Sequence, residues 1–172
     1  MYEVDARDRV VELEDVPQSS VGAPLPLVVA DERTVQLAYY ASAPAPDWDG
    51  THVRVVDMGT EDPVILVEFE RGHAWFHGPP NDEAFAGHPL ASRGVRPYAA
   101  FRIDDSSWVR RLERMNSVHE HHDPEAFARL RHYVFAFHDS TFECVARSFT
   151  AVEVEGPLAR VAEAMARSLA TR

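Results

Sequence analysis

The sequence predicts an α+β protein built mainly on antiparallel β-sheet. Several short runs alternate apolar and polar residues, turn residues separate these runs, and a few segments show helical periodicity. At 172 residues, with 45% hydrophobic and 26% charged residues, the chain has an ordinary globular composition and the length of one domain. We expect a single domain over residues 1–172, with residues 1–20 as a weakly ordered arm or edge strand, and two or three helices packed on one face of the sheet.

The first half of the chain reads as short strands joined by turns. Residues 27–30 and 34–40 predict a hairpin, because apolar positions alternate on either side of a short polar turn. We expect a further strand around residues 52–58 and a second hairpin over residues 64–77, with its turn at residues 71–72.

The second half of the chain mixes strands with helices. A strand over residues 98–103 is followed by cap residues and by a helical stripe of Trp108, Leu112 and Met115, which we expect to face the core. The other predicted elements are a short helix that begins at Asp123 and Pro124 and ends near residue 131, a hairpin over residues 132–149, and an amphipathic helix over residues 158–169.

Composition excludes several classes of function. All 17 basic residues are arginine, and a chain without lysine cannot anchor pyridoxal phosphate (PLP) as a Schiff base or form a Walker-type phosphate loop. The single cysteine, Cys144, excludes an internal disulfide and an iron–sulfur cluster. The formal charge of -11 argues against a nucleic-acid partner. Because no apolar run approaches the length of a membrane helix, we expect a cytoplasmic protein without a membrane partner.

Side-chain alternation in the two later hairpins predicts one polar face. In the hairpin over residues 132–149, a turn of two or four residues makes His138 and Glu143 neighbours. In the earlier hairpin, the same reasoning puts His73 and His77 on one face. If both hairpins share one sheet and orientation, these four side chains line a common His/Glu surface opposite the helices.

This His/Glu surface carries the chemistry that we expect. Imidazole and carboxylate groups are ligands for zinc and non-haem iron, so His73, His77, His138 and Glu143 are the candidate ligands of a divalent transition metal. His138 and Glu143 could also act as catalytic acid and base without a metal. The same pattern equally suits a solvated polar sheet face with ordinary histidines.

Three further residues are candidates for ligand binding. Arg147 could clamp a carboxylate or phosphate, although an internal ion pair is its more ordinary use. Trp75 adds an aromatic ring to the polar face. His88 lies in the stretch 78–97, whose four prolines and three glycines predict either an ordered functional loop or a lid over the site.

Three stretches of the chain carry a resemblance to a known family. They are HYVFAFHDSTFEC (132–144), GPPNDEAFAGHPL (78–90) and SSWVR (106–110). Over residues 21–149 the chain resembles an uncharacterised family of small bacterial hypothetical proteins. The resemblance implies a bacterial source and a single domain, and it brings no activity or substrate with it.

Two functions of different classes follow from these patterns. The leading hypothesis is a small-molecule-binding domain that uses the His/Glu surface, with a metal-dependent enzyme as its catalytic form. The alternative is a non-catalytic accessory, regulatory or immunity-like protein that binds a protein partner through an exposed strand edge or its acidic surface.

Overall fold

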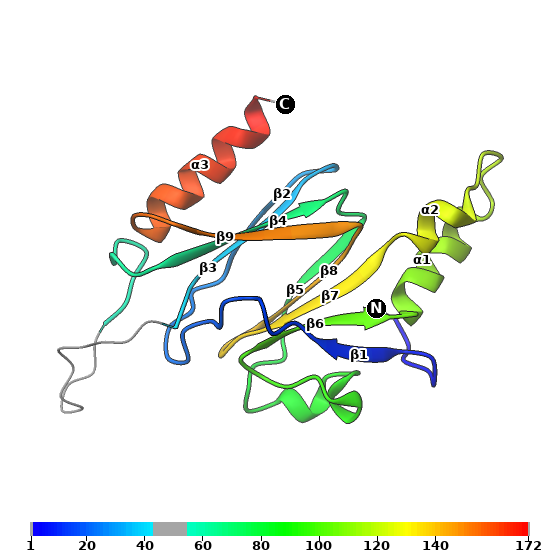
Figure 1. The fold of residues 1–172 in the computed structure, drawn as a ribbon, viewed down its shortest axis with the longest axis horizontal. Helices are drawn as coiled ribbons and strands as arrows, with labels where there is room; N and C mark the ends of the chain where they lie inside the picture. Colours follow the sequence, from blue (N-terminus) through cyan, green and yellow to red (C-terminus); the bar gives the residue numbers. More distant parts are fainter. Residues whose placement is uncertain (1, 43–54, 172) are drawn as a thin grey trace.

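The computed structural model describes residues 2–42 and 55–171. Within these residues, two antiparallel sheets pack face to face and three helices lie outside them (Figure 1). The five-stranded sheet has the order β1 (Arg9–Glu12), β6 (Ala99–Asp104), β7 (Arg131–Ala136), β8 (Thr141–Ala146) and β5 (Ala74–Gly78). The four-stranded sheet has the order β2 (Leu27–Ala30), β3 (Val35–Tyr40), β4 (Val64–Glu70) and β9 (Ser148–Val154). The predicted α+β class is confirmed.

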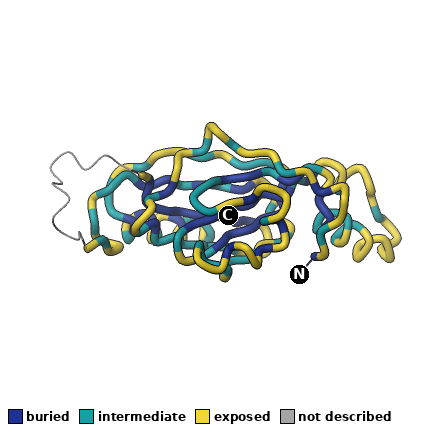
Figure 2. The backbone as a smooth tube through the Cα atoms, turned by 90° about the horizontal axis from the view of Figure 1, so that it is seen from below, coloured by how far each residue is buried: buried dark blue, intermediate teal, exposed yellow. Residues whose placement is uncertain are grey.

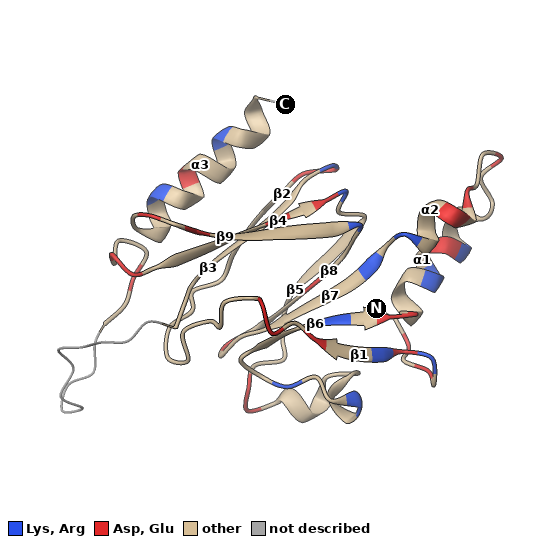
Figure 3. Ribbon diagram, viewed as in Figure 1, with Lys and Arg blue, Asp and Glu red and all other residues tan. Residues whose placement is uncertain are grey.

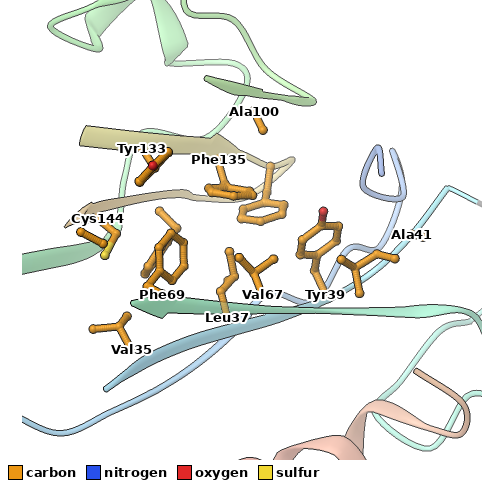
Figure 4. Close-up of a cluster of buried hydrophobic side chains, with 14 residues drawn as sticks. Val35, Leu37, Tyr39, Ala41, Val67, Phe69, Ala100, Tyr133, Phe135 and Cys144 are labelled. Carbon is orange, nitrogen blue, oxygen red and sulfur yellow. The ribbon is translucent and has the colours of Figure 1, made fainter. Parts of the chain in front are cut away.

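The main core lies between the two sheets, because each sheet turns an apolar face inward. Figure 4 shows side chains of β3 and β4 meeting those of β7 and β8. Phe69 of β4 contacts four rings from the other strands, with centroid distances between 5.5 and 6.0 Å: Tyr133, Phe135, Phe142 and Phe149. The side chains of alternate residues of β3 and of the β7–β8 hairpin point into this core, among them the buried Cys144.

The helices divide between the outer surfaces of the two sheets. Helix α3 (Leu158–Ala170) covers the four-stranded sheet and buries Leu158, Val161 and Met165 against it. Helix α1 (Ser107–Asn116) contacts β7 of the other sheet, with the short α2 (Pro124–Ala128) beside it. Of the cap residues predicted before the first helix, Ser106 caps α1, and Asp123 caps α2 at its predicted start. Met115 is 64% exposed and does not face the core, so this part of the prediction is wrong.

The stretch after β5 forms an ordered cover over the outer face of the five-stranded sheet. It holds two short 3-10 turns, η1 (Phe85–Gly87) and η2 (Ala91–Arg93). Phe85, Leu90 and Val95 are buried there against β6 and β7. Figure 2 shows the buried residues concentrated in the middle of the molecule and the exposed residues along its periphery. No helix in the described part of the chain has the length and apolar character needed to cross a membrane.

The prediction of a hairpin over residues 64–77 is wrong. β4 pairs with β3 and β9, whereas β5 pairs with β8 in the other sheet. The chain therefore crosses between sheets after Glu70, and it crosses back after β8, where the Arg147 amide donates to the Glu70 carbonyl at 2.9 Å. Alternation within a strand shows which face is apolar, but it does not show which strand will be its neighbour.

Two further predictions concern the N-terminal residues and residues 52–58. The N-terminal residues form an edge strand, β1, which pairs with β6, and they also bury Tyr2 and Asp8. Of the strand expected around residues 52–58, residues 52–54 lie outside the described residues, and residues 55–58 contain no strand.

Candidate functional site

The structure does not bring the four predicted metal ligands together. Residues opposite each other in an antiparallel pair share one face, and Glu143 lies opposite Val134 on β7 and Phe76 on β5. His77 lies opposite Phe142 and therefore on the other face from Glu143. The predicted common His/Glu surface is wrong, because the register between β5 and β8 puts His77 and Glu143 on opposite faces of the sheet.

Glu143 instead lies in a buried cluster of side chains, which we define as Tyr2, His88, His132 and Glu143. The Tyr2 hydroxyl donates to Glu143 Oε2 at 2.5 Å, and His132 Nε2 lies 2.8 Å from the same oxygen. His88 Nε2 lies 3.5 Å from Glu143 Oε1. Glu143 is 1% exposed and His132 is fully buried, so water does not compete for these contacts.

The buried cluster holds Glu143 as a carboxylate. Burial by itself raises the pKa of this carboxyl group, but the hydrogen bonds from His132 and Tyr2, together with the nearby His88, outweigh burial and lower its pKa to about 2. Burial and the neighbouring Glu143 charge together raise the pKa of Tyr2, so the phenol remains a donor. The cluster is therefore a buried anion that neighbouring donors compensate.

The tautomer of His88 does not suit a metal ligand. The Leu90 amide donates to His88 Nδ1 at 3.1 Å, so this nitrogen carries no proton, and in the neutral ring the proton must be on Nε2, which faces Glu143. A histidine that binds metal through Nε2 normally donates a proton from Nδ1, whereas Nδ1 of His88 accepts a hydrogen bond from the Leu90 amide. Among the residues that the structure describes, no group of three His, Cys, Asp or Glu side chains could hold a metal ion.

The buried cluster ties the N-terminal segment to helix α1. His132 Nδ1 lies 3.0 Å from Oγ of the helix cap Ser106. Asp8 is 2% exposed and accepts a hydrogen bond from the Ser107 amide at 2.7 Å, next to the positive end of the helix dipole. The residues before β1 are thus held at two points, by the bond from Tyr2 to Glu143 and by the bond from the Ser107 amide to Asp8.

A second polar group lies at the tip of the β7–β8 hairpin. We define this hairpin-tip cluster as His77, Asp82, Tyr98, His138 and Ser140. The Tyr98 hydroxyl donates to Asp82 Oδ2, while His138 Nδ1 lies 2.9 Å from the Tyr98 hydroxyl and 3.0 Å from Asp82 Oδ2. The backbone holds the same segments together, because the Asp82 amide donates to the His138 carbonyl at 2.8 Å.

The hairpin-tip cluster has three features that are typical of functional sites. Tyr98 adopts φ 61°, a left-handed conformation that is costly for an aromatic residue. Asp82 Oδ1 is buried and has no hydrogen-bond partner among the described residues. The side chain of His138 is 38% exposed. Its hydrogen bonds lie at Nδ1, so Nε2, which lies 3.9 Å from Asp139 Oδ1, is the nitrogen that remains for a proton or a ligand.

The hydrogen bonds of this cluster shift two pKa values in opposite directions. The bond from Tyr98, followed by that from His138, lowers the pKa of Asp82. The same Asp82 bond raises the pKa of Tyr98 to about 12. Asp82 is therefore an anion that orients the imidazole of His138, as a carboxylate does for a histidine that serves as general base.

The other predicted site residues lie around this cluster or away from it. His77 Nε2 is 3.1 Å from Ser140 Oγ, and burial lowers the pKa of His77. Trp75 is 46% exposed on the edge strand β5. Arg147 lies 3.5 Å from Glu70, the internal ion pair that the sequence analysis gave as its more ordinary use. His73 lies away from the cluster, where its ring packs 6.0 Å from that of Phe127 of α2.

A pocket of about 360 Å³ opens beside the hairpin tip, between the ends of the two sheets. Its floor comes from Tyr39 of one sheet and from Phe135 and Phe137 of the other, and Tyr98 forms part of its wall. The segment after β1 closes it on a further side, with the lining residues Leu13, Glu14, Val16, Pro17, Gln18 and Ser19. This volume lies in the range of pockets that hold small molecules, about 300–1,000 Å³.

Sequence reasoning missed Tyr2, Asp82, Tyr98 and His132. Tyr2 and Asp82 reach their partners across 141 and 56 residues, and no short-range pattern reports such contacts. For His132 a signal existed, because alternation within the β7–β8 hairpin places it on the same face as Glu143.

No family model, no curated protein and no solved structure matches the chain. The hairpin-tip cluster and the adjoining pocket are the features of the molecule from which a function can be inferred.

Proposed function

We propose that the protein binds a small molecule in the pocket between the two sheets, with the hairpin-tip cluster as the polar group beside it. The carrying observation is the position of Tyr98, which lines the pocket and also bonds to Asp82 and His138. Its left-handed backbone supports this proposal, because such strain is typically kept where a side chain has a specific task.

Proton transfer is the chemistry that these residues could add to binding. Asp82 orients Nδ1 of His138, so that Nε2 is available to accept a proton and return it. Tyr98 connects the pocket wall to this pair. Tyr98 is the member of the hairpin-tip cluster that lines the pocket, so in an enzymatic form of the proposal Tyr98 meets the substrate, and Asp82 and His138 position its hydroxyl.

The test is a ligand screen against the wild-type protein and against a variant in which a larger side chain fills the pocket. Val16 is a half-buried lining residue, and Val16→Trp would fill the pocket without removing a side chain from the core between the sheets. The matched control is Val152→Trp, on the exposed face of β9, where the residue is 49% exposed. Ligands found by NMR screening should lose binding with Val16→Trp and keep it with Val152→Trp.

The screen has a clear negative outcome. If fragments bind both variants as they bind the wild type, the pocket is not the binding site and the proposal is wrong. If they bind only the wild type and the control, Tyr98→Phe then reports whether the hydroxyl contributes to binding.

The exposed edge strand β5 favours a second candidate function, binding of a protein partner. β5 lies at the edge of the five-stranded sheet and presents Trp75, and an open edge with an exposed aromatic residue can receive a strand from another chain. Trp75→Arg should remove such a partner without altering the small-molecule screen. A partner that binds both forms equally would exclude this edge as its site.

A further inference from the structure

The edge strand β5 (Ala74–Gly78) lacks the features that usually protect an exposed strand edge. It pairs with β8 on one side, and no strand of the described chain pairs with its other side. Its sequence AWFHG contains no proline and no Asp, Glu, Lys or Arg, and Figure 3 shows it in tan, whereas the edge strand β1 carries blue and red positions. Soluble proteins normally place charges, prolines or a cover at such edges, which prevents strands of different molecules from pairing.

The other edge strands differ from β5 in this respect. β1 carries Arg9 and Glu12, and β9 carries Glu153. β2 also has no charged residue, but it is four residues long and none of its residues is exposed. β5 is thus the edge strand that combines an uncharged sequence with an exposed aromatic side chain, that of Trp75.

The side chain of Trp75 extends the inner face of its sheet beyond the core. Trp75 lies opposite Cys144 and therefore points to the same side of the sheet as this core residue. Cys144 is fully buried, whereas Trp75 is 46% exposed, so the four-stranded sheet covers β8 there but does not cover the indole ring. Tryptophan is among the residues that contribute most to protein interfaces. The ring is thus accessible to a molecule that adds a strand at β5.

The sequence of β5 is complementary to itself in an antiparallel pair. When a two-fold axis passes between Phe76 and Phe76 of a second copy, Trp75 lies opposite His77 of the second copy. Ala74 lies opposite Gly78 in the same register. Each indole ring is then beside an imidazole on the inner face, and cross-strand aromatic pairs stabilise antiparallel sheets. No like charges meet within the pair, because β5 has no charged residue.

The charges at the two ends of β5 favour the same antiparallel arrangement. Arg71 is exposed just before the strand. Because Gly78 lies opposite Thr141, the hairpin-tip residue Asp139, whose side chain is 83% exposed, lies just beyond the other end. In the two-fold pair, Arg71 of each copy is level with Asp139 of the other, two strand spacings or about 10 Å away, which an arginine side chain can span. A parallel pair would bring the like ends of the two copies together.

We propose that β5 binds β5 of a second copy of this chain, so that two five-stranded sheets join into one continuous sheet across a two-fold axis. This inference rests on the second candidate function, because it names the partner that the β5 edge receives. A second copy presents the same strand in the reverse direction, and this matches both the self-complementary sequence of β5 and the opposite charges at its ends.

The first measurement is a dilution series of the wild-type protein, from about 1 mM to about 10 μM, which covers the dissociation constants of weak to moderate interfaces. Sedimentation equilibrium should show dimers at the higher concentrations and monomers at the lower ones. In NMR spectra of the same samples, the amide signals of residues 74–78 should shift with concentration, whereas those of residues 148–154, on the edge strand β9, should stay in place.

Two substitutions to arginine on edge strands identify the edge that the dimer uses. Trp75→Arg should raise the dissociation constant of the dimer at least about tenfold, because each dimer loses two aromatic anchors. Val152→Arg is the matched control, since it places the same charged side chain at a 49% exposed position of β9, and it should dimerise as the wild type does.

A charge exchange tests the direction of pairing with residues that are exposed and remote from the core. Arg71→Asp and Asp139→Arg should each weaken the dimer by about twofold to fivefold, the range of an exposed ion pair. The double variant reverses both charges and should restore the wild-type dissociation constant. A double variant that dimerises more weakly than either single variant overturns the antiparallel pairing.

The remaining outcomes separate the second copy from the β5 edge itself. A chain that sediments as a monomer up to 1 mM, with unmoved amides in residues 74–78, overturns the second copy as partner, while the edge can still receive a different chain in the test given above for Trp75→Arg. A dimer that Val152→Arg disrupts and Trp75→Arg does not would use β9, and this result overturns the proposal as well.

Discussion

Replacing Glu143 by glutamine should destabilise the protein in a manner that depends on pH. The fall of the Glu143 pKa from its ordinary 4.5 to about 2 corresponds to about 3 kcal/mol of folding free energy, at about 1.4 kcal/mol per pH unit. Because the pKa is lower in the folded state, this stability is fully present above about pH 5 and is lost as the pH falls towards 2. The glutamine amide would also place an N–H group against the donors from which Glu143 now accepts hydrogen bonds.

The assay is urea unfolding from pH 2 to pH 7, followed by tryptophan fluorescence. Trp108 is a suitable reporter, because its ring stacks on Tyr2 at 5.5 Å and meets His132 edge-on at 5.1 Å. Near pH 7, Glu143→Gln should cost about 3 kcal/mol or more in the free energy of unfolding. The difference from wild type should shrink as the pH approaches 2.

The control for this experiment is Glu153→Gln, on the exposed part of β9. It should follow the wild-type curve at every pH within a few tenths of a kcal/mol, as surface substitutions usually do. A cost for Glu143→Gln that stays constant across the pH range, or that is below 1 kcal/mol at pH 7, would refute the account of Glu143 as a compensated buried carboxylate.

Three other substitutions test separate parts of the structure. Tyr2→Phe removes one donor to Glu143 and should lower the free energy of unfolding in urea by about 1–3 kcal/mol. If this free energy does not change, the N-terminal residues are not held in place by this bond. Tyr98→Phe removes the leading cause of the lowered pKa of Asp82. The pKa of Asp82 should therefore rise towards its ordinary value, which a carboxyl-detected NMR titration measures. As the pH falls, the stability that Asp82 contributes should then be lost at a higher pH than in the wild type. Met165→Ala leaves a cavity under α3 and should cost about 2–5 kcal/mol by the same unfolding assay.

The sequence by itself determined the local elements and their faces. The apolar alternation of β3 and of the β7–β8 hairpin is read correctly because a strand repeats every two residues, whatever its neighbours are. The caps Ser106 and Asp123 are read correctly because the side chain of a cap bonds to the backbone of its own helix. Helix α3 follows from the spacing of its own apolar residues.

Only the tertiary structure decided which strands are neighbours and which polar side chains meet. β4 and β5 are adjacent in sequence, yet they belong to different sheets. β5 pairs with β8 instead, in a register that puts His77 and Glu143 on opposite faces. The choice of neighbour depends on how two apolar faces are buried together, which no window of sequence contains. For the same reason Asp82, and not Glu143, is the carboxylate that bonds to His138.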